Sequence, residues 1–126
     1  MMPDLQNWNV LLVEDEVDAQ DVVTSILHQY NIEVTSAYTA EDALALMQYY
    51  RPTLAIIDLA LPNMDGWQLL SEMQANPELA QIPAIAMTAY HSTHVAQEAI
   101  AAGFVAYFPK PINAHTFVED LVNVLS

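Results

Sequence analysis

The feature that most constrains the fold is an alternation along the chain: short apolar, β-rich runs are each followed by a segment with helical spacing of its apolar residues. The runs are Trp8–Val13, Ile32–Ala37, Thr53–Asp58, Ile82–Thr88 and Phe104–Phe108. The third run is apolar on both faces, which is typical of a buried strand in a parallel sheet. Five β-then-α units of this length predict an α/β fold: an open, doubly wound parallel sheet with helices on both faces.

The segments between the runs carry start and stop signals for helices. Apolar residues recur at helical spacing from Ala19 to Tyr30. Thr39, with Asp42 three residues on, predicts a capped helix that ends before Pro52. We place the remaining helices at Trp67–Gln74, at Thr93–Ala102 with Gly103 as the C-terminal cap, and from about Asn113 to Leu125.

The length of 126 residues fits one compact domain, which we expect to span residues 1–126 with a core from about 8 to 125. No repeat or linker divides the chain, and no signal peptide or long apolar stretch is visible, so we expect a cytoplasmic protein that does not enter a membrane. The net charge is −14, with 2 basic and 16 acidic residues. Nucleic acids and anionic lipids are therefore poor partners, and a basic protein or a bound cation fits better.

Acidic residues follow two of the predicted strands. Glu14 and Asp15 come where the first strand ends, and Asp58 ends the third. In an open parallel sheet the ligand site lies at the carboxyl ends of the strands, so the three carboxylates converge if those strands are neighbours. Close carboxylates repel one another, and a hard divalent cation such as Mg²⁺ relieves the repulsion.

The same edge receives a hydroxyl and an ammonium group. Thr88 ends the fourth strand, and Lys110, the only lysine in the chain, follows the fifth. A carboxylate nucleophile, a cation site, a hydroxyl donor and an ammonium group together suit phosphoryl transfer.

The segments LLVEDE, LAIIDLALPNMDGWQLL, IPAIAMTAY and VAYFPKPI closely resemble the response-regulator receiver domain of two-component signalling, in the CheY-like superfamily. The resemblance covers nearly the whole chain, in order. It implies a flavodoxin-like (βα)5 fold with strand order 2-1-3-4-5.

The resemblance assigns roles residue by residue. Asp58 is implied as the phosphoacceptor, with Mg²⁺ (Mn²⁺ as the alternative) bound by Asp15 directly, by Asp58 and by the Ala60 carbonyl, while Glu14 acts through water or helps to position the metal. Lys110 is implied to contact the phosphoryl group and to precede a cis bond to Pro111. Thr88 and Tyr107 are implied as the switch residues.

The implied function is phosphotransfer from a histidine kinase or a histidine phosphotransfer protein to Asp58, which alters contacts with a downstream protein. Such a chain is a signalling switch, monomeric or weakly dimeric, that catalyses only its own phosphotransfer and dephosphorylation. Two alternatives stay open: an interaction module that works without phosphate, and a fragment of a larger regulator or hybrid kinase. A haloacid-dehalogenase-type hydrolase is disfavoured because Ala60 stands where its second Asp would be, and a flavodoxin because Glu14-Asp15-Glu16 would repel phosphate.

Several of these residues also have ordinary structural explanations. Glu14 and Asp15 could simply begin a helix, and Thr88 and Tyr107 are common β residues. His91 and His94 could share a helix face and bind a transition metal, although a solvated helix end explains them more simply. Tyr90, two residues beyond Thr88, is expected to restrict the water that hydrolyses the phosphorylated form.

Overall fold

The computed structural model describes residues 5–125. Short 3₁₀ turns at Leu5–Asn7 and Leu79–Gln81 accompany the regular elements. In chain order these elements are β1 (Asn9–Val13), α1 (Val17–His28), β2 (Glu33–Ala37), α2 (Ala40–Leu46), β3 (Leu54–Asp58), α3 (Gly66–Gln74), β4 (Ala84–Thr88), α4 (Thr93–Ala102), β5 (Ala106–Pro109) and α5 (Phe117–Leu125).

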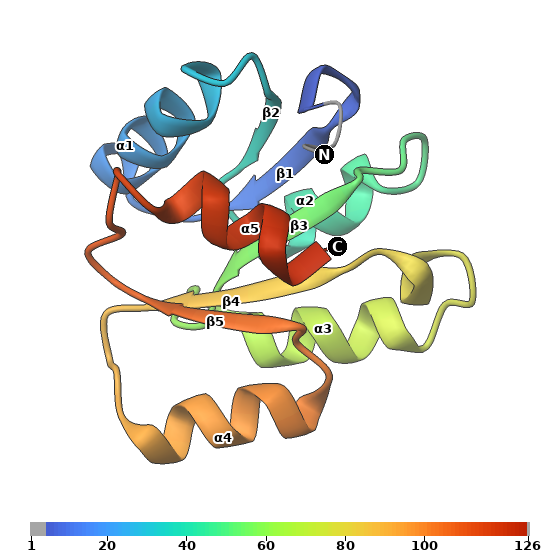
Figure 1. Ribbon diagram of the computed structural model, residues 1–126. Helices are drawn as coiled ribbons and strands as arrows, with labels where there is room; N and C mark the ends of the chain where they lie inside the picture. The colour runs from blue at the N-terminus through green and yellow to red at the C-terminus, as the bar shows by residue number, and fades with distance from the viewer. Residues whose placement is uncertain (1–4, 126) are drawn as a thin grey trace.

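All neighbouring strands pair in parallel, in the order β2-β1-β3-β4-β5. This is the flavodoxin-like order that the resemblance to receiver domains implies. The register pairs Val13 with Ile57 and Asp58 with Met87, so the ends of β1, β3 and β4 lie at one edge of the sheet. The loops that leave this edge are on the left of Figure 1.

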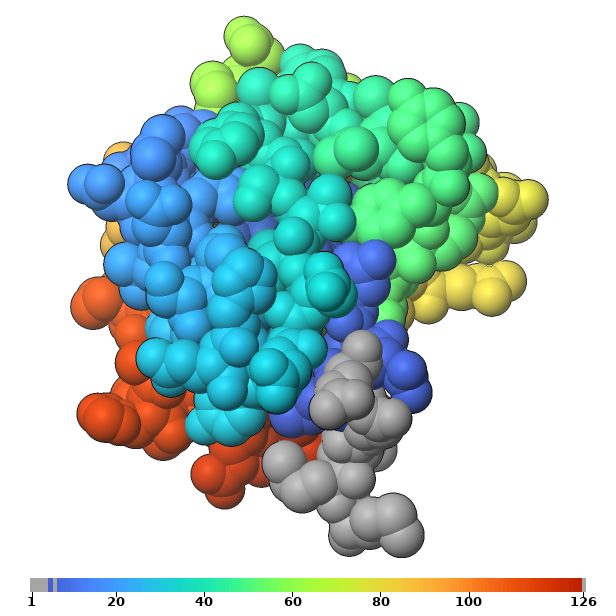
Figure 2. All heavy atoms as spheres, turned by 90° about the horizontal axis from the view of Figure 1, so that it is seen from above, coloured from blue at the N-terminus to red at the C-terminus, as the bar shows by residue number. Residues whose placement is uncertain are grey.

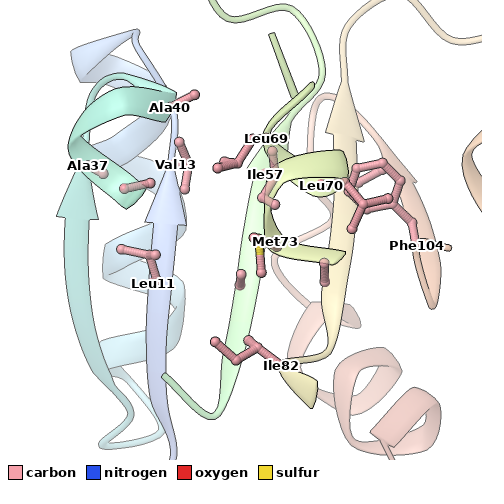
Figure 3. Close-up of a cluster of buried hydrophobic side chains, with 14 of the residues drawn as sticks. Leu11, Val13, Ala37, Ala40, Ile57, Leu69, Leu70, Met73, Ile82 and Phe104 are labelled. Atoms are coloured by element: carbon pink, nitrogen blue, oxygen red, sulfur yellow. The ribbon is translucent and has the colours of Figure 1, made fainter. Parts of the chain in front are cut away.

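Helices cover both faces of the sheet. On one face α1 and α5 pack over a cluster that includes Leu12, Ile56 and Phe117. Figure 2 shows α1 beside β2, with residues of the α5 region next to them. On the other face α2, α3 and α4 enclose a second cluster, in which Ile57 of β3 lies beside Leu69 and Met73 of α3, and Val13 of β1 lies near Ala40 of α2 (Figure 3).

The ends of several predicted elements are displaced because backbone groups close turns instead of extending strands. The predicted strands that begin at Trp8, Ile32 and Thr53 begin one residue later, although the Thr53 N–H still bonds to the Asn9 carbonyl of β1 and closes no turn. The N–H of Trp8 closes a turn to the Leu5 carbonyl. The N–H of Ile32, which lies beyond the end of α1, bonds to the Leu27 carbonyl in the last turn of that helix. Trp8 and Ile32 are nevertheless buried, so their apolar character reflects packing and not strand pairing.

The larger displacements have the same cause. Ile82 bonds to Leu79 at the end of a 3₁₀ turn, so β4 begins only after Pro83. Phe104 is buried, but its N–H bonds to the carbonyl of Ala99 in the last turn of α4, and β5 therefore starts at Ala106. The predicted start of the last helix near residue 113 is also wrong, because residues 114–116 form a turn before α5.

Side-chain caps fix three helix starts. Thr39 accepts a hydrogen bond from the Asp42 N–H at 3.0 Å, as its spacing predicts, and Ser92 accepts one from Val95 at 3.0 Å. Asp65 forms a reciprocal capping box with Gln68, so Gly66 opens α3 and does not belong to the preceding loop. Within residues 5–125, no helix has the length and apolar content needed to cross a bilayer.

Candidate functional site

Four strand ends bring the predicted site residues to one edge of the sheet. Glu14 directly follows β1, Asp58 ends β3 and Thr88 ends β4. Lys110 follows β5, and its N–H bonds to the Thr88 carbonyl at 2.8 Å. The order β1-β3-β4-β5 therefore assembles residues that are up to 96 positions apart in the sequence.

The predicted convergence of three carboxylates is confirmed. One carboxylate oxygen from each of Glu14, Asp15 and Asp58 lies within 4.8 Å of the others. Glu14 and Asp58 are buried whereas Asp15 is exposed, so the group opens to solvent on one side. Hard oxygen donors at this spacing suit Mg²⁺, which takes one or two protein carboxylates and keeps several waters.

The lysine at this edge contacts two of the carboxylates. The Lys110 ammonium donates to Asp58 Oδ2 at 3.1 Å and also to Glu14 Oε1. The pairing of Lys110 with Glu14 was not predicted, because the sequence assigned Glu14 to a metal. The lysine side chain also covers the proposed acceptor: Asp58 is 3% exposed, and the Lys110 side chain is 15% exposed.

Burial and pairing act against each other in this cluster. Burial raises the pKa of Glu14 to about 7, and the hydrogen bond from Lys110 opposes that rise. Burial lowers the pKa of Lys110, but its hydrogen bonds and charge interactions with Glu14 and Asp58 outweigh burial and raise it overall. The ammonium therefore stays charged, and a single positive charge faces three carboxylates.

Asp58 is held on two sides. The Ala60 N–H donates to Asp58 Oδ1 at 3.0 Å, and Lys110 binds the other oxygen. Ala60 itself is exposed at the start of the loop. A Cβ atom at Gly66 would lie 2.5 Å from the Asp58 carbonyl oxygen and 2.8 Å from Leu59 Cα, so only glycine lets α3 start this close to the end of β3.

The predicted switch residues lie beside this group. Thr88 is one position beyond Met87, the β4 partner of Asp58, and its buried hydroxyl accepts the Tyr90 N–H at 3.0 Å. Tyr107 is partly buried, and its hydroxyl lies 2.9 Å from His91 Nδ1. The Lys110–Pro111 bond is cis, as expected.

The alternative metal pair is not formed. His91 is directed to Tyr107, whereas His94 pairs with Glu98 one helical turn along α4. Glu14, Asp15 and Asp58 make up the one cluster in residues 5–125 where three or more potential ligand side chains come together.

One buried polar residue behind the site is not predicted by the sequence pattern. Gln20 on α1 donates its amide to the carbonyls of Leu12, Glu14 and Ala37, at 3.0–3.1 Å. These bonds tie the ends of β1 and β2 to the acidic loop. A polar residue at a buried position of an amphipathic helix was the available signal.

An apolar hollow of about 370 Å³ lies beside Lys110 and Met87. Side chains of α1 line it on one side, and Lys110, Pro111 and Ile112 of the loop after β5 line it on the other. The exposed Val17 and Val22 lie on the same helix. The site therefore has a polar centre and an apolar border.

Comparisons with known proteins agree with this architecture. The family model for the response regulator receiver domain matches residues 10–122. An uncharacterized 14.6 kDa protein of Leptolyngbya boryana is 35% identical over 112 residues, which is 89% of this chain and 86% of that protein. The transcriptional regulatory protein ZraR of Salmonella typhimurium is 33% identical over 94% of this chain, which spans 26% of that longer protein.

The solved structures give the same result. The chemotaxis response regulator CheY4 of Vibrio cholerae superimposes with a TM-score of 0.85 at 27% identity, covering 93% of this chain and 98% of that one. The chain therefore belongs to the response regulator receiver domain family, whose members are phosphoryl-accepting signalling switches.

Proposed function

We propose that Asp58 is the residue that accepts the phosphoryl group, and that phosphorylation changes the contacts this chain makes with other proteins. The observation that carries the proposal is the convergence on Asp58 of the Lys110 ammonium and the Glu14 and Asp15 carboxylates. The phosphoryl donor would be a histidine kinase or a histidine phosphotransfer protein, and a downstream protein would recognise the product.

In the proposed reaction, an Asp58 carboxylate oxygen attacks the phosphorus atom of a phosphohistidine. The new O–P bond forms as the P–N bond breaks, and the released imidazole takes up a proton. Lys110 already touches Asp58 and would neutralise charge on the transferred group, while Thr88 would donate a hydrogen bond to one of its oxygens.

Asp15, Glu14 and Asp58, with the Ala60 carbonyl, would hold the divalent cation. Bound there, Mg²⁺ would screen the carboxylates and the phosphoryl oxygens. Because Glu14 already binds Lys110, we assign it a supporting part, through water or through the position of the ammonium.

Transfer also requires the Lys110 side chain to move. The ammonium contacts one carboxylate oxygen of Asp58, the Ala60 N–H contacts the other, and Asp58 is nearly enclosed, so an incoming phosphorus atom would meet the lysine. A flexible lysine stem can swing aside and still reach the phosphoryl oxygens. The phosphorylated form is thus expected to exchange the Lys110–carboxylate contacts for contacts with phosphate.

Magnesium dependence tests this function. With Mg²⁺ and phosphoramidate, we expect the intact mass of the chain to rise by one phosphoryl group, and with EDTA in place of Mg²⁺ we expect no rise. In Asp15→Asn, half-maximal phosphoryl uptake should need a higher Mg²⁺ concentration, because one of the clustered carboxylates is lost. Uptake that is equal with and without a divalent cation would contradict the proposed metal site.

Magnesium should also stabilise the fold if these carboxylates bind it. A ligand that binds only the folded chain adds about 2.7 kcal/mol at a hundred times its Kd. We expect urea unfolding of the wild type to shift to higher denaturant on Mg²⁺ addition, with a smaller shift for Asp15→Asn at the same concentration. Equal shifts for both proteins would mean that the ion binds elsewhere.

Tyr90 is expected to slow hydrolysis of the phosphorylated form. Tyr90 is 74% exposed, and its N–H bonds to Thr88 Oγ1. We propose that its ring restricts the path of a water that would attack phosphorus and release the Asp58 carboxylate. Tyr90→Ala should speed dephosphorylation on the order of tenfold, a change of about 1.4 kcal/mol in the barrier. Tyr49→Ala, at another exposed tyrosine, should leave the rate unchanged. An unchanged rate in Tyr90→Ala would refute this role.

A further inference from the structure

The loop between β4 and α4 contains a contact that the proposed phosphotransfer does not use. His91 Nδ1 lies 2.9 Å from the Tyr107 hydroxyl, and the two rings lie with centroids 5.5 Å apart at 35°. The contact joins the loop to β5 across 16 positions of the sequence. His94, three residues on, makes no such contact and pairs with Glu98.

The Tyr107 hydroxyl is held from more than one side. Burial raises the pKa of Tyr107, and a hydrogen bond from the Ser92 backbone opposes that rise, so the phenol oxygen has an N–H donor on one side. The hydroxyl forms a second hydrogen bond with His91 Nδ1, in which the imidazole tautomer decides which group donates. Two neighbouring loop residues thus hold one tyrosine ring.

The same loop is tied to the phosphorylation site at its other end. Thr88 Oγ1 accepts the Tyr90 N–H at 3.0 Å, and His91 is the next residue. If Thr88 turns toward a phosphoryl group on Asp58, this bond is lost and the loop is released from the end of β4. The imidazole moves with the loop, so its contact with Tyr107 depends on the state of Thr88.

We infer that His91 is a positioning residue, which holds Tyr107 in the arrangement of the unphosphorylated chain and so couples the tyrosine to Thr88. This inference rests on the proposed function. A bond made in only one of two arrangements favours that arrangement by its own free energy. Removing the bond should therefore free the Tyr107 ring and ease phosphorylation.

The test compares four single variants and one double variant without and with phosphoramidate. His91→Phe keeps an aromatic ring but removes the ring nitrogens, and His91→Asn keeps a polar side-chain atom near the position of Nδ1. His94→Ala is the control for loss of a neighbouring histidine, and Tyr107→Phe removes the hydroxyl. The readouts are the Tyr107 ring resonances in the phosphate-free chain and the rate of phosphoryl uptake by intact mass.

We expect His91→Phe to shift the Tyr107 resonances and to raise the uptake rate about 2- to 10-fold, the range that one net hydrogen bond supports. His91→Asn should restore much of the wild-type behaviour, and His94→Ala should match the wild type. In a Tyr107→Phe background, His91→Phe should have no further effect, since the bond is already absent.

Unchanged Tyr107 resonances and an unchanged rate in His91→Phe would overturn the inference, as would an equal effect of His91→Phe with and without the Tyr107 hydroxyl. The two proposals fail differently. If the wild type takes up no phosphoryl group, the proposed function is wrong, while the resonances of the phosphate-free variants still decide whether His91 positions Tyr107.

Discussion

Replacing Lys110 with methionine is expected to lower the free energy of unfolding by roughly 3–5 kcal/mol, the cost of removing one partner from a buried ion pair. Methionine retains much of the apolar stem but leaves Glu14 and Asp58 buried without their cation. Protonation of Glu14 limits the loss, because burial already raises its pKa to about 7. Phosphoryl uptake should fall in the same variant, since the ammonium contacts a carboxylate oxygen of Asp58, the proposed acceptor.

The chain supplies a matched control, because Arg51 is its one other Lys or Arg residue. Arg51 pairs with Glu78, and these side chains are 40% and 73% exposed. Arg51→Met removes the same charge but breaks a surface pair, for which about 1 kcal/mol or less is expected. Urea unfolding of both variants makes the comparison. A Lys110→Met loss no larger than that of Arg51→Met would contradict the structural part assigned to the ammonium.

Gly66→Ala is expected to destabilise the chain even though alanine is the better helix former. Gly66 opens α3, and on helix propensity alone the substitution would gain up to about 1 kcal/mol. The new Cβ would lie 2.5 Å and 2.8 Å from backbone atoms of Asp58 and Leu59, which no rotamer change can relieve. Overpacking of this kind costs about 1–3 kcal/mol, and the clash falls on Asp58, the proposed acceptor, so phosphoryl uptake should drop as well.

The prediction is tested by the sign of the change in the free energy of unfolding. Ser71→Ala, at an exposed position of the same helix, tests propensity without a clash and should stabilise the chain by a few tenths of a kcal/mol. Thermal unfolding and phosphoryl uptake are measured for both variants. If Gly66→Ala also proves stabilising, the close approach of α3 to the end of β3 is wrong.

The order of the elements was predictable because it depends on apolar periodicity, which the sequence displays. The exact strand ends were not. Ile82 and Phe104 are apolar and buried like strand residues, but their N–H groups bond to Leu79 and Ala99 in turns. Buried residues in turns and residues in buried strands are both apolar, so the periodicity of apolar residues alone cannot separate them.

The site likewise has a part that could be predicted from the sequence and a part that could not. Convergence of Glu14, Asp15 and Asp58 follows from topology, because parallel strands end at one edge. The partner chosen by each side chain does not follow, since it depends on rotamers and on local depth. Glu14 is buried and binds Lys110, and His91 reaches Tyr107 while His94 turns to Glu98. No spacing in the sequence distinguishes these choices.

The buried amide of Gln20 shows a further limit. Its three carbonyl partners come from β1, the acidic loop and the end of β2, which lie side by side only after the sheet forms. Such a residue reads as one polar interruption of a helical stripe. Its part in fixing the acidic loop is evident only in the folded structure.

Phosphoryl uptake at Asp58 is the central claim, and the intact mass of wild type and Asp58→Asn after incubation with Mg²⁺ and phosphoramidate tests it most directly. Asparagine keeps the size of the side chain and an oxygen to accept the Ala60 N–H, but it removes the nucleophilic carboxylate. We predict a gain of one phosphoryl group on the wild type and none on Asp58→Asn. A folded wild type that gains no mass, or an Asp58→Asn variant that gains as much as the wild type, would contradict the account.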